Sequence, residues 1–339
     1  MIKLGYGLIT CQTHPDDPRD WQTLYTEALE LAKIAESSGA ESIWVSEHHF
    51  TDDGYLPALL PLMSALAAVT TTASIGSAMV LAPLYDPVRL AEDAAVTDLI
   101  SRGRVILGLG LGWREEEFAA LDRSTKTRAR ALENAINVCR AGWQGQPAKT
   151  SADGSRYGYI VPQPANGRIP IWIGAGADVG LRRAGRLADG YMATNCTPDE
   201  LATSVRTVRE EAERHGRNPD DIEIAVHLQT FVTDDADPWA AASDHILYQT
   251  WKYTEFGLKF GFNGVLQRRP KLDSHFESWA RDISVVGSAE RVAERIHEYS
   301  DRVGGNLHFI ARSYFPGLGA QRQRDGAMAL ADVRRSLQP

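Results

Sequence analysis

Short runs rich in β-branched apolar residues alternate with longer segments of helical period, and this pattern repeats eight times along the chain. The helical segments carry apolar residues at intervals of three and four, as one face of a helix does. The short runs cover residues 3–9, 42–45, 74–81, 104–109, 169–173, 190–194, 222–232 and 307–311. This alternation predicts an α/β fold of parallel βα units, and eight such units close most naturally into a (β/α)8 TIM barrel. An open doubly wound sheet with a small added domain is the alternative that periodicity leaves open.

Two connections are longer than a βα unit requires. Residues 142–168 are rich in Gly and Pro and follow the helix after strand four, and residues 237–284 follow strand seven. We expect both segments to be insertions at the barrel rim, one after strand four and one after strand seven. Since no short repeat or interdomain linker divides the chain, residues 1–339 are expected to form one domain.

The composition argues against several classes of function. The chain has 36 basic and 44 acidic residues, a net charge of −8 and no dense basic run, which disfavours binding to nucleic acid or to an anionic membrane. Its three cysteines lack the spacing of a disulfide framework or a structural zinc site. The N-terminus lacks the apolar run of a signal peptide, and no stretch approaches the roughly 20 apolar residues of a membrane span. We therefore expect a cytoplasmic protein.

The segment Glu47-His48-His49-Phe50 follows strand two, at the end of a barrel where catalytic residues gather. Adjacent residues of a strand point to opposite faces, so only one of the two histidines can face the barrel mouth. His227 and His308 lie on strands seven and eight, and their orientation is left open by the pattern. A metal-dependent hydrolase that combines them with His48 is therefore one alternative, although no metal ligands are assigned.

Two glycine-rich segments follow strands four and five. Residues 108–112 alternate glycine with leucine, which suits the close approach of a flat ring or, alternatively, tight packing against a backbone. Residues 171–180, IWIGAGADVG, combine a strand, a glycine turn and a helix start, an order that directs backbone amides at an anion. Arg182 and Arg183 could add positive charge, whereas Asp178 is equally explained as an ordinary N-cap.

Nine aromatic residues are concentrated in the segment 237–284. This composition indicates a lid over an apolar substrate, with a local core or an oligomer interface as the alternatives.

These features, in this order, resemble the bacterial luciferase-like, flavin-dependent monooxygenase family. The resemblance covers nearly the whole chain and is carried by the segments EHHFT, GSAMVLAPLYDPVRLAED, LISRGRVILGLGLGW, IPIWIGAGAD, RLADGY, VVGSAERVAERI and ARSYFPG. It implies a (β/α)8 barrel with an insertion after strand seven. It also implies that reduced FMN reacts with O2 to a C4a-hydroperoxide, which oxidises a small, largely apolar substrate.

The resemblance also assigns the site residues. His48 matches the family's catalytic histidine, an acid or base beside the flavin, which suits the proton exchange of imidazole near neutral pH. The ring is expected against the ends of strands three and four, where the family has a cis peptide that matches Ala78 and Met79. Where luciferase has a reactive cysteine and a phosphate-binding arginine, this chain has Gly110 and Leu111. Phosphate binding would then rest on the backbone amides of Gly174, Ala175, Gly176 and Ala177.

The departure at Gly110 and Leu111 leaves room for the deazaflavin-dependent branch of the superfamily, which transfers hydride and does not activate oxygen. The EHHF motif favours the flavin branch, so FMN is the expected cofactor and a deazaflavin coenzyme the alternative. Because a nicotinamide fingerprint is lacking, we expect a separate NAD(P)H-dependent flavin reductase to supply reduced FMN. A homodimer is expected. A flavin-binding storage or sensor protein without turnover is a further alternative.

Overall fold

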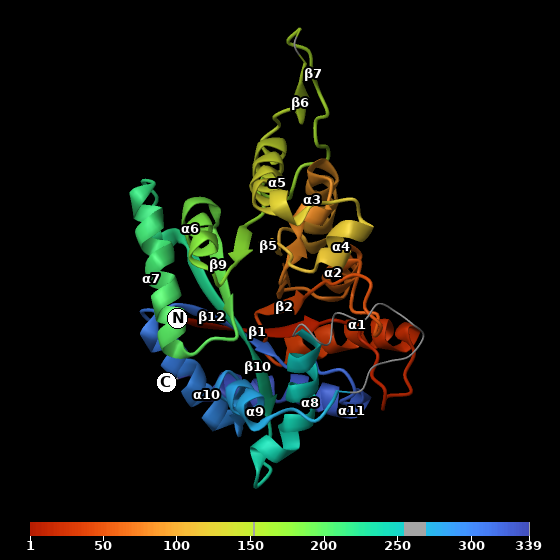
Figure 1. The fold of residues 1–339 in the computed structure, drawn as a ribbon, viewed down its shortest axis with the longest axis vertical. Coiled ribbons are helices and arrows are strands. Elements are labelled where there is room, and N and C mark those ends of the chain that lie inside the picture. Colours follow the sequence, from red (N-terminus) through yellow and green to blue (C-terminus); the bar gives the residue numbers. More distant parts are fainter. Residues whose placement is uncertain (152, 254–268, 339) are drawn as a thin grey trace.

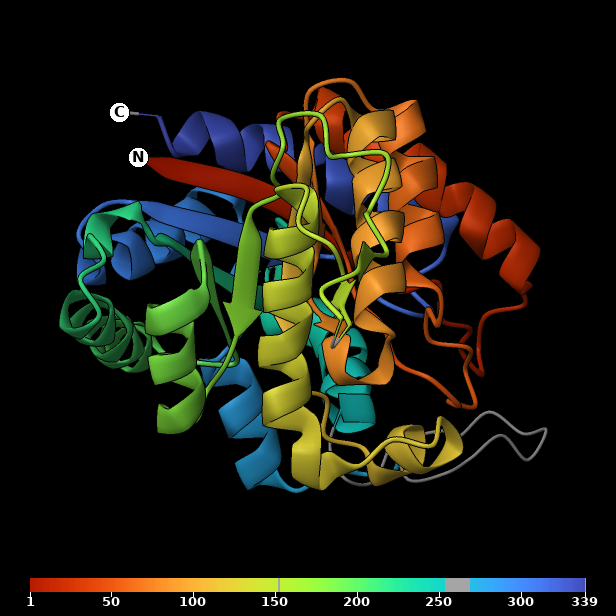
Figure 2. The same cartoon turned by 90° about the horizontal axis from the view of Figure 1, so that it is seen from above.

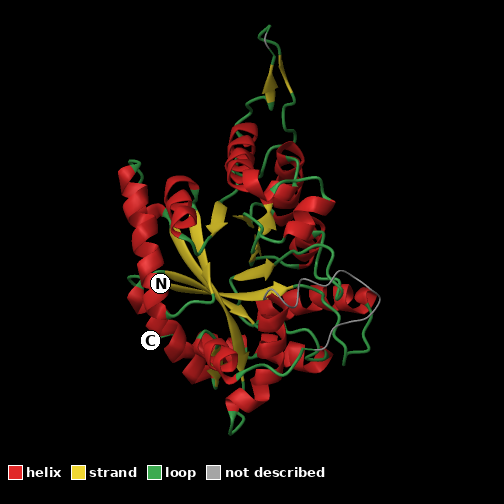
Figure 3. Ribbon diagram, viewed as in Figure 1, coloured by secondary structure: helices red, strands yellow, loops and turns green. Residues whose placement is uncertain are grey.

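The computed structural model describes residues 1–151, 153–253 and 269–338. Its parallel strands close into a barrel, and helices lie outside them (Figure 1, Figure 3), so the predicted (β/α)8 TIM barrel is confirmed. The barrel strands follow one another in chain order, and the last pairs with both its neighbour and the first. They are β1 (Ile2–Ile9), β2 (Ser42–Val45), β3 (Ser74–Ser77), β5 (Val105–Gly110), β8 (Ile171–Gly174), β9 (Gly190–Thr194), β10 (Glu223–Val232) and β12 (Leu307–Arg312).

Two short strands complete the main sheet. The strand β4 (Val80–Leu81) follows β3 after a break and pairs with β5, and β11 (Val285–Gly287) pairs with the end of β10. Because β1 lies beside β12, the two ends of the chain lie side by side (Figure 1, Figure 2). The terminal amino group of Met1 donates a hydrogen bond to the carbonyl of Gly305 at 2.6 Å.

Four of the helices around the barrel begin at side chains that accept hydrogen bonds from first-turn amides. Asp20 caps the first helix and Asp86 the third, while Thr197 and Glu200 form a capping box. The outer helices are α1 (Trp21–Ser37), α2 (Leu59–Val69), α3 (Pro87–Ser101), α5 (Arg128–Trp143), α6 (Asp178–Leu187), α7 (Pro198–Arg214), α10 (Ala289–Arg302), α11 (Ala320–Met328) and α12 (Leu330–Ser336). None of the described helices combines the length and the apolar character that a bilayer span requires.

The barrel interior is filled by side chains in layers. At the amino end of the strands, Lys3 pairs with Glu223, their Nζ and Oε1 atoms 2.7 Å apart. The middle layer contains the indole rings of Trp44 and Trp172, 5.2 Å apart, with small and aliphatic residues around them. The interior is therefore a packed core, and open space for chemistry exists only beyond it, at the carboxyl ends of the strands.

The segment 142–168 lies at the end of the barrel opposite the mouth. It runs from α5 to the start of β8 and contains a small hairpin, β6 (Lys149–Thr150) and β7 (Arg156–Tyr157), which projects from the molecule (Figure 1). The amide of Ala165 donates to Asp98, whose other carboxylate oxygen accepts the amide of Val105 at the start of β5. Since this segment lies at the amino ends of the strands, it does not line the mouth.

The segment 237–284 leaves the carboxyl end of β10 and is described as two helices, α8 (Pro238–Tyr253) and α9 (Ser274–Asp282). Tyr248 and Trp251 of α8 are buried, whereas Trp279 of α9 is 39% exposed. Three of the aromatic residues on which the prediction of a lid rests, Phe256, Phe260 and Phe262, lie outside the described residues. Their part in a lid therefore stays a prediction.

Candidate active site

His48 is buried at the end of the barrel that follows β2, whereas His49 is only partly buried, so the two neighbouring histidines have different surroundings, as the sequence predicts. Strand β2 ends at Val45, so the position of His48 is given by its contacts. His48 is 5% exposed, and its ring stands 5.0 Å from the ring of Tyr55 and 5.4 Å from that of Tyr253. Trp113 completes this aromatic surround at 6.3 Å. The imidazole is therefore held in a largely apolar setting.

A fully buried carboxylate, Glu117, fixes the orientation of His48. It belongs to α4 (Glu115–Ala120), in the connection that follows β5, the fourth barrel strand. Its Oε1 atom lies 2.9 Å from Nδ1 of His48 and accepts the amide of His49, also at 2.9 Å. Burial raises the pKa of Glu117, but hydrogen bonds from His48 and His49 and the charge of Arg114 outweigh it, so the net shift is downward.

The ionised carboxylate determines which nitrogen of His48 can take a proton. An ionised carboxylate only accepts hydrogen bonds, so Nδ1 of His48 must carry its hydrogen toward Glu117. In the neutral ring the lone pair is then on Nε2, which makes no hydrogen bond to a described residue. This arrangement prepares His48 to act as a general base at Nε2, with Glu117 stabilising the imidazolium. Glu117 is not among the site residues expected from the sequence.

Glu47 has a structural role beside this pair. It is 1% exposed and accepts hydrogen bonds from the Leu81 amide and the Tyr85 hydroxyl, each at 2.7 Å. Burial raises the pKa of Glu47 to about 8. The side chain thus connects the end of strand two to the chain that follows the break in strand three.

Strand three breaks where the resemblance implies it. The peptide between Ala78 and Met79 is cis, and it separates β3 from β4. The glycines of neighbouring strands make room for this break. A Cβ atom on Gly110 would lie 3.0 Å from Cβ of Met79, and one on Gly174 would lie 2.9 Å from its Cε. On Gly108 it would lie 2.0 Å from the carbonyl oxygen of Ser77.

These contacts favour the packing interpretation of the alternating glycines. The face without side chains is covered by Met79 and by the backbone of strand three. A flat ring in the mouth would accordingly rest on Met79 more than on bare glycine backbone. Leu111 is partly buried and packs against the hydrophobic core. Its aliphatic side chain has no polar group with which to bind a phosphate.

Residues Gly174 to Ala177 form a turn between the end of β8, the fifth barrel strand, and the start of α6. Asp178 is the first residue of that helix and not its N-cap, because Ala177 holds the cap position. A Cβ atom on Gly176 would meet no atom within 4 Å. The turn opens on a cavity of about 630 Å³, which is also lined by the carboxylate residues Asp178, Asp199 and Glu200. First-turn amides have no partner within their own helix, so this turn has donors for an anion, although its surroundings are acidic.

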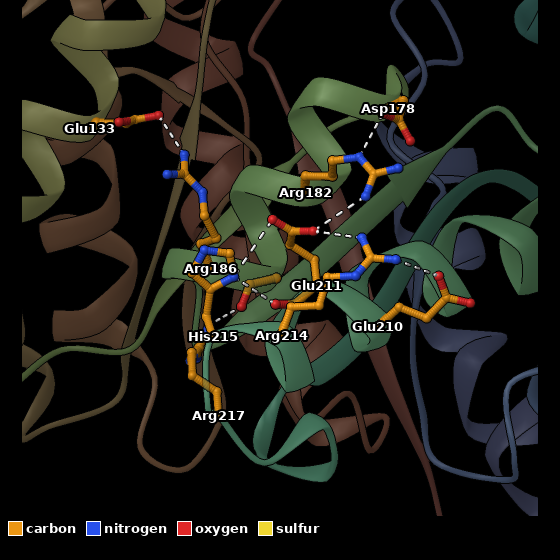
Figure 4. A network of polar contacts seen from close by, with 10 residues as sticks. Glu133, Asp178, Arg182, Arg186, Glu210, Glu211, Arg214, His215 and Arg217 are labelled. Atoms are coloured by element: carbon orange, nitrogen blue, oxygen red, sulfur yellow. Dashed lines mark hydrogen bonds and ion pairs between the residues drawn. The ribbon is translucent and has the colours of Figure 1, made fainter.

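The two arginines expected to add charge at this turn are already paired, and Figure 4 shows the contacts of Arg182. Nε of Arg182 lies 2.8 Å from Asp178, and its Nη1 lies 3.3 Å from Glu211 of α7. Nε of Arg183 lies 2.8 Å from Glu133 of α5. Carboxylates from neighbouring helices neutralise both guanidinium groups, so neither is available to a phosphate at the mouth.

The three histidines of the hydrolase alternative do not converge. His308 lies deep in the barrel, where Nε2 is 2.7 Å from the hydroxyl of Ser42 and Nδ1 is 3.2 Å from Glu223. His227 lies nearer the mouth, beside Thr194 at 3.3 Å. Among residues 1–151, 153–253 and 269–338, no group of three His, Cys, Asp or Glu side chains is arranged to hold a metal ion. The histidine set proposed for a metal site is therefore wrong.

Comparison with known proteins identifies the family. Residues 6–305 match the profile of the luciferase-like monooxygenase family. The F420-dependent glucose-6-phosphate dehydrogenase of Mycolicibacterium fortuitum is 31% identical over 251 residues, 70% of each chain. The enzyme of that name from Nocardia farcinica is 28% identical over 300 residues, 84% of this chain and 88% of the relative. The crystal structure of monooxygenase RslO1 from Streptomyces bottropensis has the same fold, with a TM-score of 0.80 at 18% identity over 97% of both chains. The family match and the closed barrel together establish that this chain belongs to the luciferase-like monooxygenase family of oxidoreductases.

Proposed function

We propose that the protein is a dehydrogenase that uses the deazaflavin coenzyme F420 to oxidise an alcohol. The observation that carries this proposal is the 31% identity, over 70% of both chains, to a dehydrogenase that is named for F420. It reverses the preference that the EHHF motif gave to FMN. The substitution of Gly110 and Leu111 for the luciferase cysteine and arginine agrees with this change of branch.

The residues of the mouth fit such a coenzyme. The turn at Gly176 has space and backbone donors for an anionic tail. The cis bulge at Ala78 and Met79 gives the end of strand three an apolar surface for a flat ring. His48 follows the neighbouring strand β2, with Nε2 available. Ala78, Met79 and the turn from Gly174 to Ala177 are therefore proposed to hold the coenzyme.

When bound, a deazaflavin supplies the hydride acceptor. Oxidation of an alcohol to a carbonyl compound removes one hydride from carbon and one proton from oxygen, so the protein must accept the proton. We assign that role to Nε2 of His48, with Glu117 holding the ring and stabilising its positive charge. The rings of Tyr55, Trp113 and Tyr253 exclude water from the base.

Binding and turnover test this proposal. Purified protein is titrated separately with F420 and FMN, and glucose 6-phosphate is the first alcohol to try, because the F420-dependent relatives are named for it. We expect tighter binding of F420 and loss of its visible absorbance on addition of substrate without oxygen. His48→Asn should still bind F420 but lose most of this turnover. The proposal fails if F420 does not bind, and unchanged turnover in the variant would exclude His48 as the base.

A second candidate is the FMN-dependent monooxygenase, with reduced FMN delivered by a separate NAD(P)H-dependent reductase. The aromatic surround of His48 favours it, since oxygen chemistry also requires a base shielded from water. Substrate-dependent oxygen consumption in the presence of photoreduced FMN, together with no binding of F420, would select this candidate.

A further inference from the structure

Arg312, the last residue of β12, is a buried cation, and two of its nitrogen atoms are unpartnered among the described residues. It is 3% exposed, and its Nε and Nη2 atoms have no hydrogen-bond partner in the part of the chain that the structure describes. Its neighbour there is Tyr253, whose ring centroid is 4.5 Å from the guanidinium carbon; burial lowers the pKa of Arg312, and the contact with Tyr253 only partly opposes this. Burying an arginine with two of its N–H-bearing nitrogens unsatisfied is costly, so this group points to a ligand.

The side chain of Arg312 points into the barrel mouth. His308 and Ile310 on the same strand lie in the barrel interior, and residues two apart share a face. Arg312 is therefore the next inward residue, beyond the packed layers. The ring of Tyr253 stands between Arg312 and His48, 5.4 Å from the imidazole. The guanidinium group of Arg312 and the imidazole of His48 therefore lie on either side of the same tyrosine ring.

The described groups that face Arg312 include no carboxylate to compensate its charge. Its register partners are Gly7 on β1 and Gln229 on β10. Gly7 has no side chain, and the amide of Gln229 donates to Thr250 at 2.7 Å while its buried Oε1 stays unpartnered. His227 on β10 remains neutral, because burial and the charge of Arg312 lower its pKa to about 3. No carboxylate among the described residues forms an ion pair with Arg312.

The free atoms of Arg312 define the shape of the ligand. Nε and Nη2 form one edge of the planar guanidinium, and two parallel N–H bonds from such an edge match the two oxygens of a carboxylate or a phosphate. The proposed coenzyme turn at Gly174 follows β8, which is three strands away from β12 around the barrel. An anion held by Arg312 is therefore placed beside His48 and away from that turn.

We propose that Arg312 binds an anionic group of the substrate, a carboxylate or a phosphate, and so selects hydroxy acids or sugar phosphates over neutral alcohols. The choice of substrate as the source of this anion rests on the proposed function. Binding of the anion itself does not, because it can be measured on the protein without coenzyme.

The variant Arg312→Met tests the inference, with Arg322→Met as the matched control. Arg322 also lies over an aromatic ring, that of Phe231 at 5.6 Å, but it is an exposed residue. Without coenzyme, we expect inorganic phosphate or acetate to stabilise the wild type saturably in thermal unfolding. Arg312→Met should weaken this binding by roughly ten- to hundredfold, and the control should not. Arg312→Lys should fall between, since it keeps the charge and loses the paired geometry.

Kinetics then identify the source of the anion. With F420 present, Arg312→Met should raise the KM for glucose 6-phosphate by roughly ten- to hundredfold and leave that for glucose unchanged. The inference is overturned if the variant keeps the wild-type anion stabilisation, or if both substrates respond equally. A raised Kd for the coenzyme with unchanged anion binding would assign Arg312 to the coenzyme instead. Loss of anion binding in a protein that does not bind F420 would refute only the proposed function.

Discussion

Lys252 of α8 connects the insertion after strand seven to the loop after strand two, and its removal is expected to destabilise the protein strongly. Its ammonium group forms an ion pair with Asp52 and lies 3.6 Å from Asp53, and the three side chains are each 1% exposed. Gln12 donates to Asp53 at 2.6 Å. Lys252→Met keeps the length of the side chain and leaves two buried carboxylates without this cation. Removing one partner of a buried pair costs about 3–5 kcal/mol.

Thermal unfolding measures this cost. An unfolding entropy of about 2.1 cal/mol/K per residue amounts to roughly 0.7 kcal/mol/K for a chain of this length. The expected loss therefore lowers Tm by about 4–7 °C in calorimetry. The triple variant Lys252→Met, Asp52→Asn, Asp53→Asn should recover most of the loss, because it removes all three charges together. An unchanged Tm for Lys252→Met would refute the assignment of stability to this cluster.

The pH dependence of the same variant adds a second test. Burial raises the pKa of Asp53 above the usual 3.8, and the charge of Lys252 only partly opposes this. A group with a raised pKa contributes stability below its unfolded value and loses it as pH rises through the folded value. Without Lys252 the folded pKa of Asp53 rises further. The difference in Tm between wild type and variant should therefore be small in acid and widen toward neutral pH; a constant difference would contradict the electrostatic explanation.

Three further predictions concern the mouth. Glu117→Gln should lower kcat by roughly 10² with little change in coenzyme Kd, since the tautomer of His48 is no longer imposed; equal kcat values would exclude the pair. Glu47→Gln should flatten the Tm profile near pH 8, because the wild type loses stability as pH rises through the pKa of about 8 that burial gives Glu47; an unchanged slope would contradict this. Gly176→Ala should keep Tm and weaken coenzyme binding, whereas Gly174→Ala should cost about 1–3 kcal/mol through its contact with Met79; equal Tm values would reject that contact.

Local patterns predicted the barrel strands well, because strand character depends on neighbouring residues. The predicted runs 42–45 and 190–194 coincide with β2 and β9. The run 74–81 is wrong as a single strand, since the cis peptide after Ala78 divides it into β3 and β4. Composition alone does not reveal that break; the resemblance to a family did. Strand alternation predicted only that one of the two neighbouring histidines faces the mouth. The resemblance to the family singled out His48.

The carboxylate that orients His48 could not be found in this way. Glu117 lies 69 residues further along the chain and meets the imidazole only when the barrel closes. In the sequence it is one of three successive glutamates, a pattern that also fits ordinary stabilisation of a helix N-terminus. Its position in the loop after strand four is the one signal that could have singled it out, because such loops form the mouth.

The expectation that Arg182 and Arg183 add positive charge to the anion site was wrong for a related reason. Tertiary structure decides which carboxylates form ion pairs with an arginine. Arg182 and Arg183 have the right place in the sequence for an anion site, but Glu211 and Glu133 from other helices neutralise them. Arg312 has no such signal in the sequence and ends in the mouth without a carboxylate among the described residues. A net charge of −8 therefore says little about where an anion can bind.

Lys252 and Arg312 are both buried cations, yet their surroundings give them opposite roles. Two carboxylates face Lys252 and neutralise its charge within the fold. Replacing Lys252 should therefore lower Tm without changing the affinity for phosphate. Arg312 faces an aromatic ring and an amide, so its replacement by Met should leave Tm unchanged or higher in the absence of anions. Anion affinity should respond in the opposite way, falling only in the Arg312 variant. If both variants lost stability and anion binding together, the two cations would belong to one cooperative unit, and a separate substrate-selecting arginine would not exist.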